Sequence, residues 1–442
     1  MKRMKTIKSI SMKQKIKLES GYEVFFQTPD DGYSYFFGYY DKSPLNLNNS
    51  KLLSHRVSFD SRDVKDGDIA EVGYFDLKTK LFIRIDDTLA WNWQQGSQLQ
   101  WLSPEFDKEI IYNKVIDNSF VSVIYNLETK KKRVIPFPIY VVHPNGKEAL
   151  GINYERHYWC RPGYNYQNIK NTKWDKPYHK DDGIYKIDLI NGKFDQLIKI
   201  TDIIDNEKLP EFEKCNNWLE HMMYNPSGNR FMFFHRWHKE KDHTRLYTVN
   251  SDNGSDLFLF PDNDKFYSHA DWKNDAELTI WTKEFKNKTA VNSVKRTVNT
   301  INKIKVLLNI VRPFYRALKF YLPQKMVNEI SSQSKLLNYK DKTNEYEIVG
   351  DGFLYGNGHI TWSNDKKYLL NDTYADKKGY RQLMLYSIEK RKIINIGKFF
   401  SVYNSCGYRA DLHPRFSADN KMIIIDSAHI NKRKIILIAN NY

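Results

Sequence analysis

One short pattern recurs seven times along this chain of 442 residues. Each copy joins the end of a strand-like run to a turn rich in Pro, Asp, Asn or Gly and then to a second apolar run, as in SPLNLNNSKLLSHR from Ser43. The later copies begin at Ser103, His143, Asn225, Lys273, Ser363 and Ser417. Between the copies lie runs with the alternation and tight turns of β-hairpins, so one copy and one hairpin supply the four strands of a propeller blade. The sequence therefore predicts an all-β fold, a seven-bladed β-propeller.

The spacing between copies divides the chain further. Successive copies are 60, 40, 82, 48, 90 and 54 residues apart, whereas a blade needs about 40–45 residues, so the longer intervals must hold insertions. We expect a basic N-terminal arm over residues 1–20 and a single propeller domain over residues 21–442. The early run YEVFFQ (22–27) is expected to complete the last blade beside the C-terminal run KIILIA.

Two insertions are predicted. Residues 154–182 are rich in Tyr, Trp, Arg and turn residues, which is typical of a loop that contacts a substrate, or of a flap that stabilises a blade edge. Residues 285–345 form the second, a basic helical insertion, because the apolar side chains of 305–322 recur on one helical face. This helix either caps the propeller or makes peripheral contact with an anionic membrane surface.

The composition narrows the class of protein. The net charge is +16, but ten basic residues and no acidic one lie between Phe285 and Lys325, which leaves +6 for the rest, so no nucleic-acid partner is expected. Aromatic residues make up 15% of the chain, which suits stacking on sugars. The three cysteines are far apart in the sequence, which fits a reducing compartment. No apolar run approaches the roughly 20 residues that span a bilayer, and we find no secretory signal. We therefore expect a cytoplasmic protein, or one at the inner membrane face.

Four copies of the pattern carry a histidine at the same position, followed three residues later by an aromatic residue. They are His221 in HMMYNPSG, His269 in HADWKNDA, His359 in HITWSNDK and His413 in HPRFSADN. The first strand of every propeller blade lines the central channel, so this register places four imidazoles on adjacent sides of one channel mouth. The same register in the first three blades holds Tyr39, Leu99 and Ile139.

Imidazoles at one site point to metal binding or to general base catalysis. Asp411 shares a strand face with His413 and could add an oxygen ligand, in a set suited to Mn²⁺, Zn²⁺ or Fe²⁺. Guanidinium groups bind carboxylates in a bidentate manner, so nearby arginines are candidates for holding an acidic sugar. Arg245 and Arg409 are the catalytic candidates among them, while Arg56, Arg161 and Arg415, with Tyr39, are the substrate-binding candidates.

These histidine-containing repeats resemble the oligogalacturonate lyase family of seven-bladed propellers. The resemblance implies a cytoplasmic enzyme that breaks uronate oligomers by β-elimination with a Mn²⁺ ion. By resemblance, His269, His359 and His413 are metal ligands and His221 is the base. The last ligand group departs from the family pattern of a Gln followed by two alternating histidines. This chain reads Tyr408-Arg-Ala-Asp411-Leu-His413, with Asp411 in place of a histidine and no Gln, which points to a different acidic glycan or to a branch that uses Arg409 for the carboxylate.

The sequence thus predicts a lyase that cleaves a uronate-containing acidic oligosaccharide or polysaccharide, with Mn²⁺ as the first expected metal and Zn²⁺ as the alternative. Two other functions stay open, a non-catalytic propeller that binds glycan or protein and a metal-assisted glycan hydrolase. The chain contains no GxSxG, HExxH, Walker or GxGxxG motif, which excludes the best-known nucleophile, zinc-protease and nucleotide sites.

Overall fold

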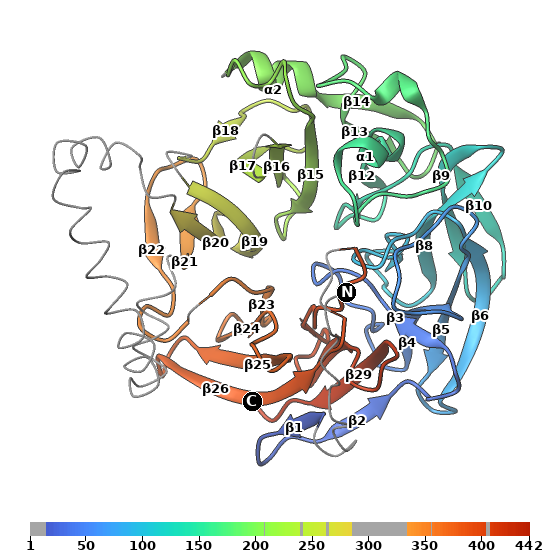
Figure 1. Cartoon of the computed structure of the whole chain (residues 1–442), viewed down its shortest axis with the longest axis vertical. Helices are drawn as coiled ribbons and strands as arrows, with labels where there is room; N and C mark the ends of the chain where they lie inside the picture. The colour runs from blue at the N-terminus through green and yellow to red at the C-terminus, as the bar shows by residue number, and fades with distance from the viewer. Residues whose placement is uncertain are drawn as a thin grey trace, which may run out of the picture.

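The computed structural model describes residues 15–206, 208–238, 242–261, 265–284, 334–354, 356–403 and 407–442. The strands of this part of the chain form seven antiparallel sheets, arranged around a common centre like the blades of a propeller (Figure 1). The blades follow one another around the ring in chain order, and the first strand of a blade lies nearer the centre than the last (Figure 1). The predicted all-β, seven-bladed propeller is therefore confirmed.

Blades 1 to 3 each have four strands in simple up-and-down order. Their strands are β3 (Ser34–Phe36), β4 (Lys51–Val57), β5 (Ala70–Asp76) and β6 (Leu81–Thr88) in blade 1, β7 (Gln100–Trp101), β8 (Glu109–Ile116), β9 (Ser119–Asn126) and β10 (Lys132–Ile135) in blade 2, and β11 (Val141–Val142), β12 (Glu148–Ile152), β13 (Gly183–Asp188) and β14 (Phe194–Lys199) in blade 3.

Blades 4 to 7 repeat this order. Their strands are β15 (Asn217–Tyr224), β16 (Arg230–His238), β17 (Asp242–Asn250) and β18 (Phe258–Leu259) in blade 4, β19 (Lys265–Asn274), β20 (Glu277–Glu284), β21 (Ser334–Lys340) and β22 (Tyr346–Ile348) in blade 5, β23 (Ile360–Trp362), β24 (Tyr368–Asp372), β25 (Tyr380–Ser387) and β26 (Lys392–Phe400) in blade 6, and β27 (Arg415–Phe416), β28 (Met422–Ser427) and β29 (Lys434–Ala439) in blade 7.

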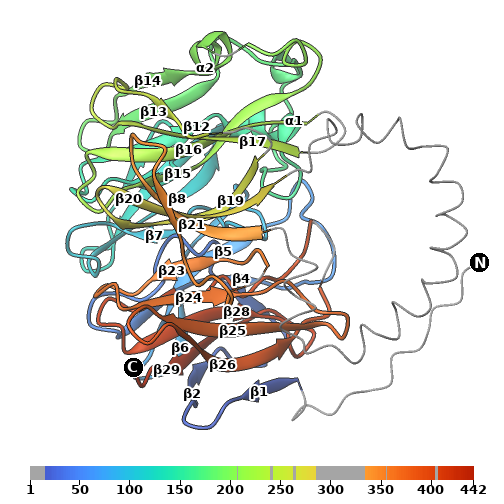
Figure 2. The same cartoon turned by 90° about the vertical axis from the view of Figure 1, so that its left-hand side faces the viewer.

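The N-terminal segment closes the ring. β2 (Val24–Gln27) pairs with β29 as the fourth strand of blade 7, so the predicted role of the run 22–27 is confirmed. β1 (Ile16–Leu18) pairs with β26 as a fifth strand of blade 6, and both figures show β1 and β2 near each other at the outer edge (Figures 1 and 2). Residues 16–18 belong to the predicted basic N-terminal arm, but they form a strand that pairs with the N–H and C=O groups along the edge of β26.

Apolar side chains pack across the boundaries between blades. One buried cluster joins blades 7, 1 and 2 through residues such as Leu437, Ile424, Leu52, Phe75, Ile110 and Val123. Another joins blades 3 and 4 through residues such as Leu150, Ile184, Phe231 and Val249. Burying each such side chain stabilises the fold by about 1.5–3 kcal/mol, which holds neighbouring sheets in a fixed relation.

The predicted loop insertion 154–182 lies between β12 and β13 and contains α1 (Tyr154–Cys160) and the 3₁₀ turn η2 (Thr172–Trp174). The Asn153 side chain accepts a hydrogen bond from the Glu155 N–H and caps α1. Arg156 is fully buried and donates to the carbonyl oxygens of Trp174 (2.5 Å), Pro177 (2.9 Å) and Asn217 (2.9 Å). These bonds tie the insertion to the first strand of blade 4. A second short helix, α2 (Ile200–Asn206), follows β14.

The basic helical insertion predicted over 285–345 is not confirmed. Its last residues were assigned wrongly, because β21 pairs with β20 as the third strand of blade 5. The run of Leu336, Leu337 and Tyr339 is buried there, as expected for an inner strand of a sheet. Residues 285–333, which include the proposed membrane-contact segment 305–322, lie outside the described residues. No helix in the described part of the chain is long and apolar enough to cross a membrane.

Three histidines outside the shared register are buried, His55 and His235 in strands of blades 1 and 4 and His157 in α1 of the loop insertion. The Nε2 atom of His55 lies 2.8 Å from Ser97 Oγ, that of His157 lies 3.0 Å from the Leu219 carbonyl oxygen, and that of His235 lies 3.2 Å from Asn217 Oδ1. Burial lowers the pKa of His55 to about 4, that of His157 to about 4 and that of His235 to about 3. All three are therefore neutral in the folded protein at neutral pH.

These buried imidazoles predict a loss of stability in mild acid. Their folded pKa lies below the ordinary value of 6.5, so the unfolded chain takes up protons first as the pH falls. The free energy of unfolding should therefore decrease from about pH 7 towards pH 4, by up to about 1.4 kcal/mol per pH unit for each group. In urea unfolding, the free energy of unfolding of His235→Gln should depend less steeply on pH than that of wild type. The control His238→Gln, which changes an exposed histidine, should match wild type. Equal slopes for wild type and both variants would contradict this expectation.

Candidate functional site

The four histidines of the shared register meet near the centre of the propeller. The rings of His269 and His359 are 4.1 Å apart and those of His359 and His413 are 4.4 Å apart, measured between centroids. Tyr39 connects the fourth histidine to this row, because its ring stacks on His221 at 5.1 Å and meets His413 edge-on at 5.0 Å. Blades 4 to 7 thus supply the imidazoles and blade 1 supplies the tyrosine, as the register predicted. Leu99 and Ile139 pack in the cores between blades instead.

Irregular backbone positions these side chains. The pairing of β15 with β16 shifts register between Glu220 and Met223, and that of β19 with β20 shifts between Tyr267 and Ala270. His221 and His269 lie at these two irregularities, which are the places where a strand can turn a side chain away from the regular alternation. His221 and His413 also adopt positive φ angles, 57° and 44°. Such angles are uncommon for residues other than glycine and concentrate at functional sites.

His359 is oriented by a carboxylate. Its Nδ1 atom lies 3.0 Å from both oxygens of Asp372, whose Oδ1 also accepts the His359 backbone N–H at 2.7 Å. Nδ1 therefore carries the proton, and Nε2 keeps its lone pair. This Nε2 atom is buried and has no hydrogen-bond partner in the described part of the protein. A carboxylate behind the imidazole is the usual support of a metal-ligating histidine.

His413 is held in the same way by a backbone carbonyl. Its Nδ1 atom donates to the Gly38 carbonyl oxygen at 2.7 Å, and its Nε2 is likewise buried and unpartnered among the described residues. Gly38 has a φ of 140°, and a Cβ atom there would lie 2.8 Å from the Gln95 carbonyl group. Only glycine lets the backbone approach this closely.

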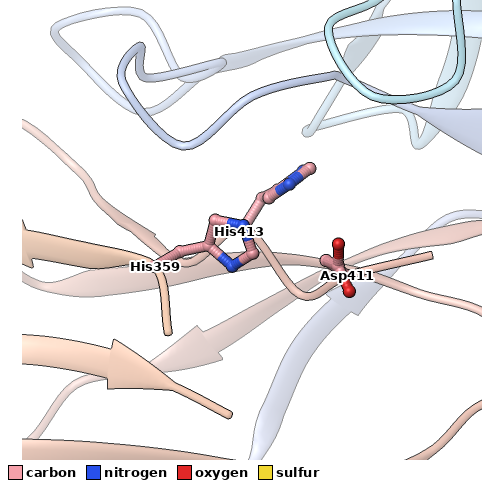
Figure 3. Close-up of side chains that lie close together, drawn as sticks. All are labelled: His359, Asp411 and His413. Atoms are coloured by element: carbon pink, nitrogen blue, oxygen red, sulfur yellow. The ribbon is translucent and has the colours of Figure 1, made fainter. Parts of the chain in front are cut away.

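Asp411 completes a group that could hold a metal ion. One nitrogen each of His359 and His413 and one Asp411 oxygen lie within 4.8 Å of one another, and all three residues are buried (Figure 3). Two imidazole nitrogens without a partner and one carboxylate are a donor set suited to a divalent transition metal. The residues therefore fit a metal site, made of the predicted ligands His359, Asp411 and His413. His269 lies outside this group.

Two arginines flank Asp411. Arg381 places Nε at 3.4 Å and Nη2 at 3.3 Å from Oδ1, and Arg409 donates from Nε to Oδ2. Burial alone would raise the pKa of Asp411, but the charges of Arg409 and Arg381 and the neighbouring His359 hold that pKa well below its usual range. Asp411 is therefore a buried carboxylate that keeps its negative charge.

His269 has a distinct set of partners. Its Nδ1 lies 2.9 Å from Asn357 Oδ1, and its Nε2 lies 3.4 Å from the Tyr374 hydroxyl. Asn357 is held in turn, since its Nδ2 donates to Ser268 Oγ at 2.9 Å. The amide oxygen of Asn357 can only accept, so Nδ1 carries the proton and Nε2 keeps the lone pair.

His221 is linked to the loop insertion through Glu220. Its Nδ1 lies 3.1 Å from the Tyr140 hydroxyl and its Nε2 lies 3.6 Å from Glu220. Burial lowers the pKa of His221 to about 3, against the opposing charge of Glu220. Glu220 forms ion pairs with Arg161 of the insertion (3.0 Å) and with Arg236 (2.9 Å). The insertion therefore reaches the edge of the site, as a loop that contacts the substrate would have to.

The other predicted arginines are placed differently. The Arg415 side chain is only 1% exposed and donates to the carbonyl oxygens of Gly38 (2.5 Å) and Tyr39 (2.8 Å) and to Asp426 (3.0 Å), so it supports the Tyr39 backbone rather than a substrate. Arg56 pairs with Glu71 in blade 1. The Arg245 guanidinium lies over the rings of Phe212 and Trp237, at 5.5 Å from each. Neither Arg56 nor Arg245 has a recorded contact with the four histidines in the described part of the chain.

Sequence reasoning did not identify the residues that contact and orient the four histidines and Asp411. They are Asp372, Asn357, Tyr140, Glu220, Tyr374 and Arg381. Two of them could have been found from the sequence, because Glu220 and Arg381 are charged residues inside largely apolar strands, where a buried charge needs a partner.

Two solved structures with the same fold are oligogalacturonate lyases. One, described as an oligogalacturonate lyase in complex with manganese, is 15% identical, with a TM-score of 0.62 over 96% of this chain and 95% of that chain. The other, from Vibrio parahaemolyticus, is 14% identical, with a TM-score of 0.61 over 96% of this chain and 97% of that chain. No protein-family model matches the chain, and no curated protein sequence matches it. The resemblance carried by the histidine repeats is thus confirmed for the fold: the chain is a seven-bladed propeller similar over almost its whole length to oligogalacturonate lyases.

Proposed function

We propose that this protein is a lyase that cleaves uronate-containing acidic oligosaccharides or polysaccharides by β-elimination. One observation carries the proposal. Two buried imidazoles, whose Nε2 atoms have no hydrogen-bond partner among the described residues, lie beside a carboxylate flanked by two guanidinium groups, in a propeller whose fold is that of oligogalacturonate lyases. The site therefore combines cation-binding groups, fixed positive charge and neutral bases.

The reaction needs these three features. A uronate carries its C5 hydrogen next to the carboxylate, and removing that proton places a second negative charge on the substrate. A base takes the proton, the electron pair forms the C4–C5 double bond, and the C4–O bond breaks. The leaving oxygen then takes a proton. Positive groups placed beforehand near the carboxylate stabilise the charge that develops, which is commonly the largest single contribution to catalysis.

His359, Asp411 and His413 would hold a divalent metal ion, Mn²⁺ by resemblance or Zn²⁺ as the alternative. When bound, such an ion would withdraw electron density from the substrate carboxylate and make the C5 proton more acidic. The side chains already present act in the same direction, since Arg409 and Arg381 bring positive charge within hydrogen-bond reach of Asp411.

We assign the base to His269 rather than to His221. His269 lies beside the metal group without belonging to it, and the Asn357 bond leaves its Nε2 as the acceptor. His221 has the Tyr140 hydroxyl at Nδ1 and, near Nε2, the buried Glu220 with its two arginine partners, whereas the group near Nε2 of His269 is the hydroxyl of the partly exposed Tyr374. In this proposal His221 supports Tyr39 and the loop insertion.

The substrate would lie against Tyr39 and Tyr374, with Arg409 and Arg161 at the edges of the site. Tyr374 is 38% exposed, and the Arg409 guanidinium lies 5.2 Å from the centre of its ring. An aromatic face beside a guanidinium suits a sugar that carries a carboxylate, because the ring packs on the sugar while the cation binds the acid.

Replacement of the proposed base gives a first test. His269→Gln should lower kcat by about 10²–10⁴-fold, because a positioned base contributes that much, while its Mn²⁺ content stays that of wild type. The measurement is the ultraviolet absorbance of the unsaturated uronate formed from polygalacturonate and other acidic glycans. His221→Gln is the matched variant and should lose less activity than His269→Gln. A larger loss of activity in His221→Gln than in His269→Gln would identify His221 as the base. Formation of reducing sugar without the absorbance of an unsaturated uronate would indicate a hydrolase instead.

Removal of the metal donors gives a second test. His359→Ala should bind less than about a tenth of the Mn²⁺ held by wild type, because a lost ligand of a three-residue site leaves too few donors. Metal analysis after dialysis measures the content, and a chelator should lower the activity of wild type until Mn²⁺ is restored. The matched control is the buried His55→Ala, which lies outside the site. Unchanged metal content in His359→Ala would show that this group is not the metal site.

A further inference from the structure

Both oxygens of the Asp411 carboxylate already have partners in this structure. Arg381 occupies Oδ1 through Nε and Nη2, and Arg409 occupies Oδ2 through Nε. A divalent cation held by His359, His413 and Asp411 must take one of these oxygens. It must also tolerate two guanidinium charges beside it, and this repulsion is weakly screened at a buried site.

The charges around the group balance without a cation. Asp372 and Asp411 supply two carboxylates, and Arg381 and Arg409 supply two guanidiniums, all in contact with the group or with each other. Adding a divalent ion leaves two positive charges in excess. The excess is reduced if one guanidinium moves away from the carboxylate it now neutralises.

The two arginines differ in their freedom to move. The Arg381 side chain is 1% exposed and belongs to β25, inside the sheet of blade 6. The Arg409 side chain is 20% exposed and lies in the irregular segment before β27. Within the described part of the chain, the Arg409 side chain forms hydrogen bonds through Nε alone, while its backbone carbonyl oxygen accepts from Gln94 and Arg433. Arg409 is therefore the partner that can leave.

We propose that Asp411 has one permanent and one releasable partner. Arg381 stays bound to Oδ1 at all times. Arg409 leaves Oδ2 when a divalent cation binds, and the Arg409 guanidinium then turns towards the carboxylate of the substrate. Arg381 is then a positioning residue for the metal ligand. Arg409 neutralises the site while it is empty and determines the preference for an acidic sugar once the ion is in place. The part that concerns the substrate rests on the proposed function, whereas the exchange at Asp411 does not.

The surroundings of Arg409 fit its second role. Its guanidinium lies over the Tyr374 ring, whose hydroxyl is 3.4 Å from Nε2 of His269, the proposed base. A released guanidinium therefore stays on this aromatic face, beside the point where the C5 proton would be removed. Its two terminal nitrogens can form the paired hydrogen bonds with which arginine recognises a carboxylate.

Titration of the metal-free protein with Mn²⁺ alone tests the exchange. Arg409→Gln should bind Mn²⁺ about tenfold more tightly than wild type in calorimetry, because the ion no longer competes with a guanidinium for Asp411. Arg409→Lys keeps the charge and should remain close to wild type. Arg381→Gln should bind Mn²⁺ more weakly, since Asp411 loses its fixed partner, and Asp411→Asn should lose binding. Arg62→Gln, which removes an arginine paired with Asp68 in blade 1, controls for the change in net charge and should match wild type.

A chemical probe gives an independent measure. Modification of Arg409 by phenylglyoxal, followed by mass spectrometry, should become severalfold faster when Mn²⁺ is added, while the modification of Arg62 stays constant. Mn²⁺ binding by Arg409→Gln that equals or falls below that of wild type would overturn the exchange, as would an unchanged rate of modification. No glycan is present in either experiment, so a failure of the lyase proposal would leave both results unaffected. If Arg409→Gln binds Mn²⁺ more tightly but loses lyase activity on uronates, this result would support the proposed role of Arg409 in binding the substrate carboxylate.

Discussion

The pairing of β2 with β29 closes the propeller, and the geometry of the centre depends on that closure. Residues from the start of the chain complete the last blade, so the sheet of blade 7 packs against blade 1 through buried side chains such as Leu437 and Phe75. Closure also brings the loop after β3 against the segment before β27. There the Gly38 carbonyl oxygen accepts from both His413 and Arg415. A ring that failed to close would leave His413 without the partner that fixes its protonated nitrogen.

The site follows one chemical rule at three of its histidines. Each imidazole has its Nδ1 atom bound to a protein acceptor, which is a carboxylate at His359, a carbonyl at His413 and an amide oxygen at His269. Their Nε2 atoms are then the ones that present lone pairs. The buried imidazoles lie next to carboxylates and guanidiniums. A cation bound at these imidazoles would therefore have charged partners and would not be an isolated buried charge. His221 does not follow the rule, and its neighbour Glu220 links it to Arg161 of the loop insertion instead.

Asp411 is the point at which this chain departs from the ligand pattern of the family that it resembles. A carboxylate in place of a neutral imidazole adds a negative charge to a buried site, and this charge requires compensation. Arg381 and Arg409 supply the compensation; Arg381 comes from β25 of blade 6, whereas Arg409 lies beside Asp411 in the segment that leads into blade 7. The substitution and the two arginines are thus physically linked. The exchange proposed at Asp411 follows from that link.

The sequence by itself determined the fold and the position of the four histidines, because both depend on a local repeat. A turn and an apolar run that recur seven times specify seven blades, and a fixed register places His221, His269, His359 and His413 at the same depth. Tertiary structure alone decided which nitrogen of each imidazole is free, which arginines reach Asp411, and that residues 16–18 form a strand. The physical reason is that these contacts join distant parts of the chain. The bond from His413 to Gly38 spans 375 residues, and no pattern within one repeat contains that information.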